Sequence, residues 1–259
     1  MRSEKWKLPD LSEPVRYALM LISIPVMWWL LVIATRVPSF LLPPPEMVGK
    51  VLWVERGSLL YHTGVTLGEA MTGYVVANVL AIGLAILFLY LPWTEQFATP
   101  YMVMLKNIPF VTVAALLIIT LGTTPAPKVI IVVLVTFFPI LANVVRGLRS
   151  VEPVLLDRMK TLNASQWQIF TKVRWPAALP YYVAAHEIAF TGSIIGAVVA
   201  EWMFARQGLG YLITTALTQY RADRLYAVTL INLLLSLGAY FLVRLLDIRL
   251  FRWKRDMPS

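Results

Sequence analysis

The chain of 259 residues contains no cysteine. Without thiols it can form no disulfide, no thiolate-ligated zinc or iron–sulfur site, and no cysteine nucleophile. Charged residues are also scarce, since Asp, Glu, Lys and Arg make up 14% of the chain, against roughly 25% in soluble domains. The sequence also lacks a G-x-x-x-x-G-K-[ST] phosphate loop, so ATP hydrolysis by that motif is excluded for this chain.

Apolar residues are abundant instead: 59% of the chain is hydrophobic and the mean hydropathy is +0.71. A membrane-spanning helix needs about 20 apolar residues, and six segments approach that length. They are, approximately, Tyr17–Thr35, Gly73–Leu91, Tyr101–Leu121, Val129–Val145, Ala177–Ala200 and Tyr226–Leu246. They lack the alternation of barrel strands, and lipid tolerates only helices or closed barrels. We therefore expect an all-α, polytopic membrane bundle of about six spans, forming one domain over residues 1–259.

Lysine and arginine are unevenly distributed between the two sides of a six-span arrangement. Most lie beside the termini and in the connection between the fourth and fifth apolar segments. Because positive residues concentrate on the cytoplasmic side, we expect both termini, including the polar segment 1–16, to be cytoplasmic. The basic residues behind the net charge of +9 cluster at the ends of apolar segments. This placement favours contact with anionic lipid and argues against nucleic acid as a partner.

The connection 146–175 is the only long cytoplasmic one. Leu162, Ile169, Phe170 and Val173 recur in it at helical spacing and form an apolar stripe on a segment too polar to span. Such a stripe has to be buried, either on the lipid surface or in the groove of a partner protein. The residues alone leave both possibilities open.

The spacing within this connection also follows a known motif. Asp157-Arg158-Met159 is followed, after three residues, by Asn163, then after nine by Val173, and after one by Trp175-Pro176. With E-A-A, G, I and L-P at these places, the segment resembles the "EAA" loop of permeases of binding-protein-dependent ABC importers. Asparagine adopts left-handed backbone more readily than other non-glycine residues, so we expect a turn at Asn163.

The resemblance covers nearly the whole chain. Leu42-Pro43-Pro44-Pro45, the stretch 108–122 and the stretch 208–213 match the branch that includes nitrate, taurine, sulfonate, bicarbonate and thiamine-precursor permeases. It implies the MetI-like fold of type I importers, the bacterial inner membrane and a non-catalytic subunit without a cofactor of its own. It also implies a second permease subunit, expected to form a homodimer, two partner subunits that bind ATP and Mg, and an external solute-binding protein.

By the same resemblance, the connection docks in a groove of the ATP-hydrolysing subunit and transmits its motion. The residues expected to take part are Asp157, Arg158, Met159, Leu162, Asn163, Ala164, Ser165, Trp167, Phe170, Val173, Trp175 and Pro176. The inserted side chains are expected to be Leu162, Ala164, Trp167 and Phe170, with Asp157 pairing or capping at the start. The alternative is that the apolar stripe packs against the chain's own helices.

Four residues inside the spans are candidates for the translocation pathway: Pro109, Glu187, Thr191 and Glu201. Pro109 should break its span, because proline removes a backbone donor and disfavours helix before it. Glu187 is a candidate because ionisable residues within spans are usually functional, and hydration near the cytoplasmic end is its alternative. For Glu201 we favour a solvated helix end beside Trp202, with contact to the binding protein or a gate at the outer mouth as the alternatives.

No metal site is expected. His186-Glu187 begins a metalloprotease signature, but Phe190 occupies the place of the second histidine. The strongest rival function is a stand-alone secondary transporter or channel, against which the absence of repeated halves argues. A small organic molecule or anion is expected as substrate, of the vitamin or pyrimidine-precursor, sulfonate, nitrate or bicarbonate type. We favour a neutral heteroaromatic compound, because the spans contain no dense cationic cluster.

Overall fold

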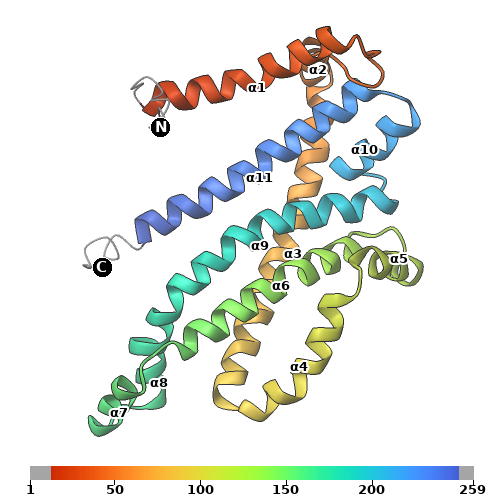
Figure 1. Ribbon diagram of the computed structural model, residues 1–259. Helices are drawn as coiled ribbons and strands as arrows, with labels where there is room; N and C mark the ends of the chain where they lie inside the picture. Colours follow the sequence, from red (N-terminus) through yellow and green to blue (C-terminus); the bar gives the residue numbers. More distant parts are fainter. Residues whose placement is uncertain (1–12, 251–259) are drawn as a thin grey trace, which may run out of the picture.

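The computed structural model describes residues 13–250, and in that part of the chain every regular element is helical. Three long helices, α6 (Pro125–Arg149), α9 (Trp175–Phe204) and α11 (Ala222–Leu250), run alongside one another, and α3 (Arg56–Tyr90) crosses behind them (Figure 1). The expected all-α membrane bundle is confirmed. Residues 1–12 of the expected polar segment 1–16 lie outside the described range.

All six predicted apolar segments fall in helices. Four helical stretches are long and apolar enough to cross a bilayer: Arg56–Tyr90, Pro125–Arg149, Gln166–Met203 and Ala222–Arg249. The pair α4 (Pro92–Asn107) and α5 (Phe110–Leu121) makes a fifth if it counts as one broken span. The first predicted segment lies in α1 (Glu13–Thr35), of which Ser23–Thr35 qualifies as a shorter apolar helix.

The third predicted span is broken where the sequence indicated. The helices α4 and α5 are bent by 92° at Ile108-Pro109. Ile108 is extended, with φ −72° and ψ 127°, because the proline ring disfavours helical backbone in the preceding residue. Pro109 is exposed at this corner, where its missing N–H costs α5 no hydrogen bond.

Several helical parts were not predicted. Helix α3 begins at Arg56, well before the expected Gly73. The N-terminal half of α3 was missed because it is more polar than a typical membrane span. The short helices α2 (Pro45–Val54) and α10 (Leu209–Thr218) lie outside the six predicted apolar segments. Gly208 forms a turn with φ of 103°, and α10 begins directly after it.

The core lies where α3, α6 and α9 meet. Ala81 of α3, Val144 of α6 and Ala178 of α9 are among its fully buried residues. Small side chains at these contacts allow helices to approach closely, which is how membrane helices gain packing contacts. Gly147 is one such close approach, because a Cβ there would lie 2.8 Å from the Cα of Ala178. The C-terminal end of α6 therefore packs closely against the start of α9.

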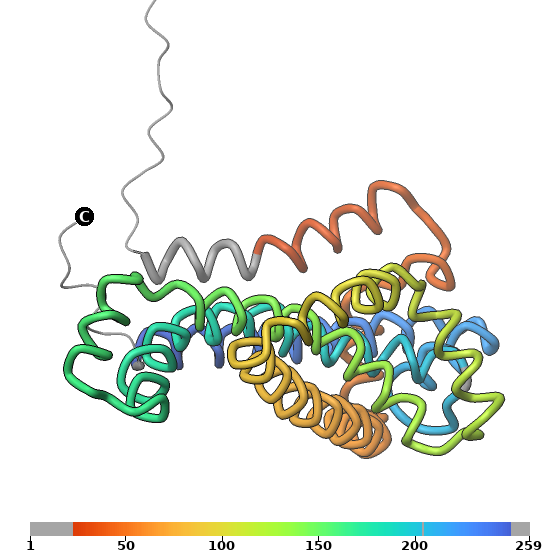
Figure 2. Tube along the Cα trace, turned by 90° about the horizontal axis from the view of Figure 1, so that it is seen from below, coloured from red at the N-terminus to blue at the C-terminus, as the bar shows by residue number. Residues whose placement is uncertain are grey.

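The short elements gather at the two ends of the bundle. Helices α7 (Pro153–Thr161) and α8 (Gln166–Ile169), with the π-helical turn η1 (Phe170–Arg174), form one end, and α2 and α10 form the other (Figures 1 and 2). The described part of α1 stands apart from the main bundle (Figure 2). We call the α7–η1 end the inner end and the α2–α10 end the outer end.

Candidate functional site

The connection at the inner end folds into two short helices separated by a tight turn. Asn163 has φ of 54°, which confirms the predicted left-handed turn after α7. Ser165 then caps α8: its hydroxyl accepts a hydrogen bond from the backbone N–H of Gln168, whose side chain accepts from Ser165 N–H. From Gln166 onward the helix continues through η1 into α9 as one rod.

The rod is fixed to the end of α6. The guanidinium of Arg174 donates to the carbonyl of Leu148 at 2.9 Å. Phe170 is 9% exposed and belongs to the main core together with Leu148, and the neighbouring Ile169 is buried as well. The α8–η1 half of the connection is therefore a rigid extension of the bundle.

Of the four side chains expected to insert into a partner, two are free to do so. Leu162 is 77% exposed and Trp167 is 71% exposed, while Ala164 is half-buried. The expectation that Phe170 inserts into a partner was wrong, because its side chain is buried in the chain's own core. The apolar stripe is thus divided, because Ile169 and Phe170 are buried whereas Leu162 is exposed.

Other residues of the motif have ordinary structural roles. Asp157 pairs with Lys160 at 2.9 Å, as expected for a pairing role, but it caps nothing, because Glu152 is the N-cap residue of α7. Pro176 lies in the first turn of α9, where its missing N–H is harmless. The exposed residues Val154 and Leu155 were missed, although two adjacent apolar residues in a polar connection are a readable signal.

The outer end holds a buried polar cluster around Glu201, which is 1% exposed. Its carboxylate accepts hydrogen bonds from the Thr66 hydroxyl at 2.9 Å and the Gly210 backbone N–H at 2.8 Å. The same hydroxyl accepts from Leu209 N–H, and His62 Nδ1 accepts from Gly208 N–H, both at 2.9 Å. The favoured interpretation of Glu201 as a solvated helix end was wrong, because the turn at Gly208 folds α10 back over the end of α9.

A second buried charge pair adjoins this cluster. Lys128 of α6 forms an ion pair with Glu69 of α3, and both residues are buried. Glu69 also interacts with Glu201, and each of these carboxylates keeps one oxygen without a donor among the described residues. Sequence reasoning missed Glu69, whose signal was a lone acidic residue just before an apolar segment.

The ion pair borders a cavity of about 590 Å³, within the usual size of small-molecule sites. Gly64, Gly68 and Thr72 line it from successive turns of α3, and Arg206 lines it from the loop after α9. A Cβ at either glycine would meet no atom within 4 Å, so these two positions leave the cavity open.

The other pathway candidates lie apart from this cavity. Glu187 and Thr191 line a groove between α9 and α11, together with Ser236 and Tyr240. Glu187 lies fourteen residues before Glu201 on the same helix, a separation of about 21 Å. The structure thus brings together only Glu187 and Thr191 of the four candidates.

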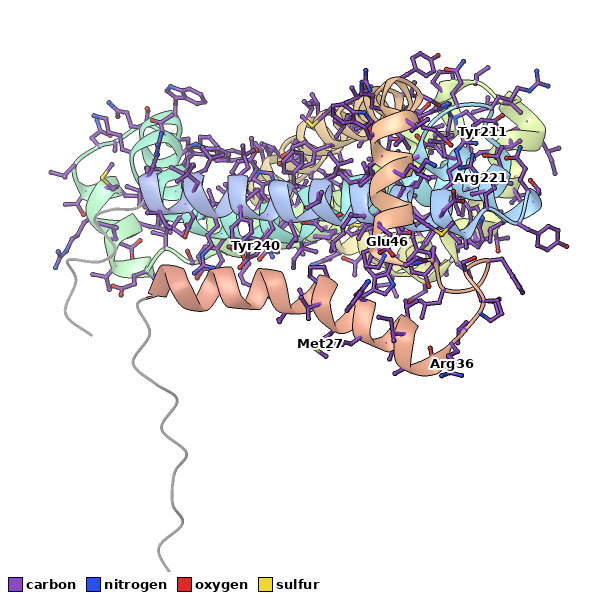
Figure 3. The ribbon with its side chains drawn as sticks, turned by 90° about the horizontal axis from the view of Figure 1, so that it is seen from above. Met27, Arg36, Glu46, Tyr211, Arg221 and Tyr240 are labelled. Carbon is purple, nitrogen blue, oxygen red and sulfur yellow. The ribbon has the colours of Figure 1, made fainter. Side chains whose placement is uncertain are left out.

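Charged residues also join the outer elements to one another. Arg221, in the loop before α11, pairs with Asp223 at 2.9 Å and with Glu55 at 2.7 Å, and Arg224 pairs with Glu55. Hydrogen bonds with Asp223 and then Glu55 raise the pKa of Arg221 above its usual value. Arg221 lies at the outer end with Tyr211, whereas Tyr240 lies farther toward the inner end of α11 (Figure 3). Within residues 13–250, no three His, Cys, Asp or Glu residues are placed to hold a metal ion.

The family described as "Binding-protein-dependent transport system inner membrane component" matches residues 77–252. A probable ABC transporter permease protein of Haemophilus influenzae is 33% identical over 83% of this chain and 88% of its own. The chain belongs to this family. It is the permease subunit of a binding-protein-dependent ABC importer, an inner-membrane component, as the loop spacing indicated.

Other relatives share this assignment. A riboflavin transport system permease protein of Chloroflexus aurantiacus is 32% identical over 97% of the permease chain and 93% of its own. A formylaminopyrimidine transport permease protein of Halalkalibacterium halodurans is 28% identical over 94% of the permease chain and 96% of its own. The relatives' names thus cover different solutes.

Solved structures of the MetNI methionine ABC transporter in inward-facing conformations share the fold of this permease. One matches with a TM-score of 0.59 and 17% identity, covering 78% of this chain and 97% of that chain. The expected MetI-like fold is confirmed.

Proposed function

We propose that the permease couples solute passage to ATP hydrolysis on a separate subunit through the exposed apolar side chains of its inner connection. These are Val154, Leu155, Leu162 and Trp167. Aromatic side chains dominate the energetics of protein interfaces, and Trp167 is the largest exposed side chain of the connection.

The observation that carries this proposal is the rigid mounting of Trp167. Its helix is capped by Ser165, tied to α6 by Arg174 and continuous with α9. A displacement applied to Trp167 is therefore passed to a membrane-spanning helix without being absorbed by a flexible loop. A mobile, lipid-resting segment would need none of these attachments.

The assembly that fits this role contains two permease subunits, expected as a homodimer, and two ATP-binding subunits that carry ATP and Mg. An external solute-binding protein delivers the solute, and both permease termini face the cytoplasm. The positive-inside distribution of Lys and Arg supports this orientation. It places the inner connection beside the ATP-binding subunits and the outer cavity toward the solute-binding protein.

The proposed solute pathway includes the groove that Glu187 and Thr191 line between α9 and α11. This groove is mostly apolar, with Ser236 and Tyr240 as further polar groups, which suits a ring with a few hydrogen-bonding substituents. Relatives named for riboflavin and formylaminopyrimidine transport support such a solute, and another is named for aliphatic sulfonates. We therefore propose a small heteroaromatic compound as substrate.

The coupling role is tested by co-purification with the ATP-binding partner. Replacing both Leu162 and Trp167 by Ala should reduce the recovered partner by about tenfold or more, because truncated interface anchors cost about 2 kcal/mol or more. Trp53→Ala is the matched control, since Trp53 is 72% exposed at the outer end. Undiminished recovery, or solute movement by this chain alone in vesicles without ATP, would contradict the proposal and favour a stand-alone transporter.

A further inference from the structure

Aromatic rings form a continuous series of contacts from the tip of the inner connection into the bundle. Ring centroids lie 5.9 Å apart for Trp167 and Phe170, and 6.1 Å apart for Phe170 and Trp175. The series continues from Trp175 to Tyr182 at 5.9 Å, and from Tyr182 to His186 at 4.2 Å. Centroid separations of roughly 4.5–7 Å are typical of packed aromatic pairs. We call these five residues the aromatic column.

The column lies on one face of the rod. Trp175, Tyr182 and His186 are separated by seven and four residues, and Phe190 follows after four more. Residues at such intervals lie above one another along one side of a helix. Each ring therefore rests on the next, and the column has no gap between the exposed Trp167 and the middle of α9.

At its far end the column is joined to a different helix. The ring of Tyr74, on α3, lies 5.4 Å from His186 and 5.1 Å from Phe190. The Tyr74 hydroxyl is 2.8 Å from His186 Nδ1, and the Tyr182 hydroxyl donates to Asn78 Oδ1 at 2.9 Å. Two hydrogen bonds thus cross from α9 to α3, in a part of the chain that water reaches poorly.

The same two helices are also joined at the outer end. There Glu201 of α9 accepts the hydrogen bond from Thr66 of α3 described above. Glu69 and Gly68, which border the outer cavity, belong to the same stretch of α3. If α9 moved without α3, the inner hydrogen bonds and the outer one would all have to break.

We propose that the aromatic column and its two hydrogen bonds to α3 make α3 move together with α9 when the partner displaces Trp167. Tyr74, Tyr182 and His186 are thereby positioning residues for transport, although they touch neither ATP nor the ATP-binding subunit. The movement carries one wall of the outer cavity. This inference rests on the proposed coupling role of the inner connection.

The absence of cysteine simplifies the test, because the permease itself contributes no thiol background to spin labelling. Cysteines would replace Lys172, on the connection, and either Gly83 on α3 or Gly238 on α11, at both of which a Cβ meets open space. Distances would be measured by pulsed electron resonance in the full complex with its ATP-binding partner, with and without ATP.

With the native column, ATP should change the 172–238 distance and leave the 172–83 distance unchanged. In the double variant Tyr74→Phe and Tyr182→Phe, ATP should change the 172–83 distance by about 2 Å or more, the scale of helix shifts at interfaces. Only two hydroxyls are removed, so the rings still stack. Asn78→Ala removes the acceptor for Tyr182, so it should change the ATP dependence of the 172–83 distance as much as Tyr182→Phe does. Combining Asn78→Ala with Tyr182→Phe should cause no further change in that distance.

Tyr61→Phe is the matched control, because Tyr61 is also on α3 and its hydroxyl also bonds one side chain, that of Gln207, but at the outer end. It should leave the 172–83 distance unchanged. An ATP-dependent 172–83 distance with the native column, or an unchanged one in the hydroxyl variants, would overturn the inference. Failure of the ATP-binding partner to co-purify with the native permease would instead overturn the proposed function on which it rests.

Discussion

The two ends of the permease differ in which side chains they bury and which they expose. At the outer end, charged and polar groups are buried and bonded to one another, as Glu201, Thr66 and Gly210 are. At the inner end, apolar groups are exposed, with Trp167 turned away from the bundle. The polar cluster of the outer end is bonded within one chain, whereas the exposed apolar side chains of the inner connection are those that we propose another protein covers. This difference separates residues that maintain the fold from residues proposed to recruit a partner.

The largest effect is expected when an ion pair at one end is compared with an ion pair at the other. Lys128→Met should lower the free energy of unfolding by about 3–5 kcal/mol, because it leaves the buried carboxylate of Glu69 without its counter-charge. Lys160→Met breaks the exposed pair with Asp157 and should cost at most about 1 kcal/mol. Thermal unfolding of both variants in detergent measures the difference. Equal losses would show that the outer pair is not the structural element we describe.

Two aromatic residues within the inner connection sharpen the comparison further. Phe170→Ala should cost about 3–5 kcal/mol, the range for truncating a buried phenylalanine. Trp167→Ala should leave stability within about 0.5 kcal/mol, as for most surface substitutions, while still weakening partner recovery. The free energies of unfolding of the purified permeases, without any partner, decide the matter. A large loss for Trp167→Ala would mean that its ring supports the fold.

The smallest expected effect concerns the turn at Asn163. Asn163→Ala should destabilise the connection by less than about 1–2 kcal/mol, the full cost of left-handed backbone, because alanine lacks the short polar side chain with which asparagine relieves part of that cost. Asn163→Gly should be neutral or better, because glycine adopts that conformation freely. Partner recovery should follow the same order. Hydrogen exchange of the α7 and α8 amides reports the local change, and a neutral alanine variant would contradict a structural role for the turn.

Local features were readable in the sequence because they depend on neighbouring residues. The break at Pro109 follows from the proline ring, and the turn at Asn163 from the tolerance of asparagine for positive φ. The apolar segments gave the helices, since lipid admits few other structures. Helices α2 and α10 were missed because each is only 10 residues long, too short to register as a span, and contains a glycine. They pack mainly against α11 and α9, respectively.

Hydropathy and motif spacing were enough to establish a helical membrane permease and to locate its inner connection. They could not decide which face of that connection is buried, because Phe170 and Trp167 are equally apolar in a sequence. The close approach of Gly147 to Ala178 decided it, by bringing α6 against one side of the rod only. The burial of Glu201 likewise depended on α10 folding back over the end of α9 and on Thr66 of α3, which is far away in the chain.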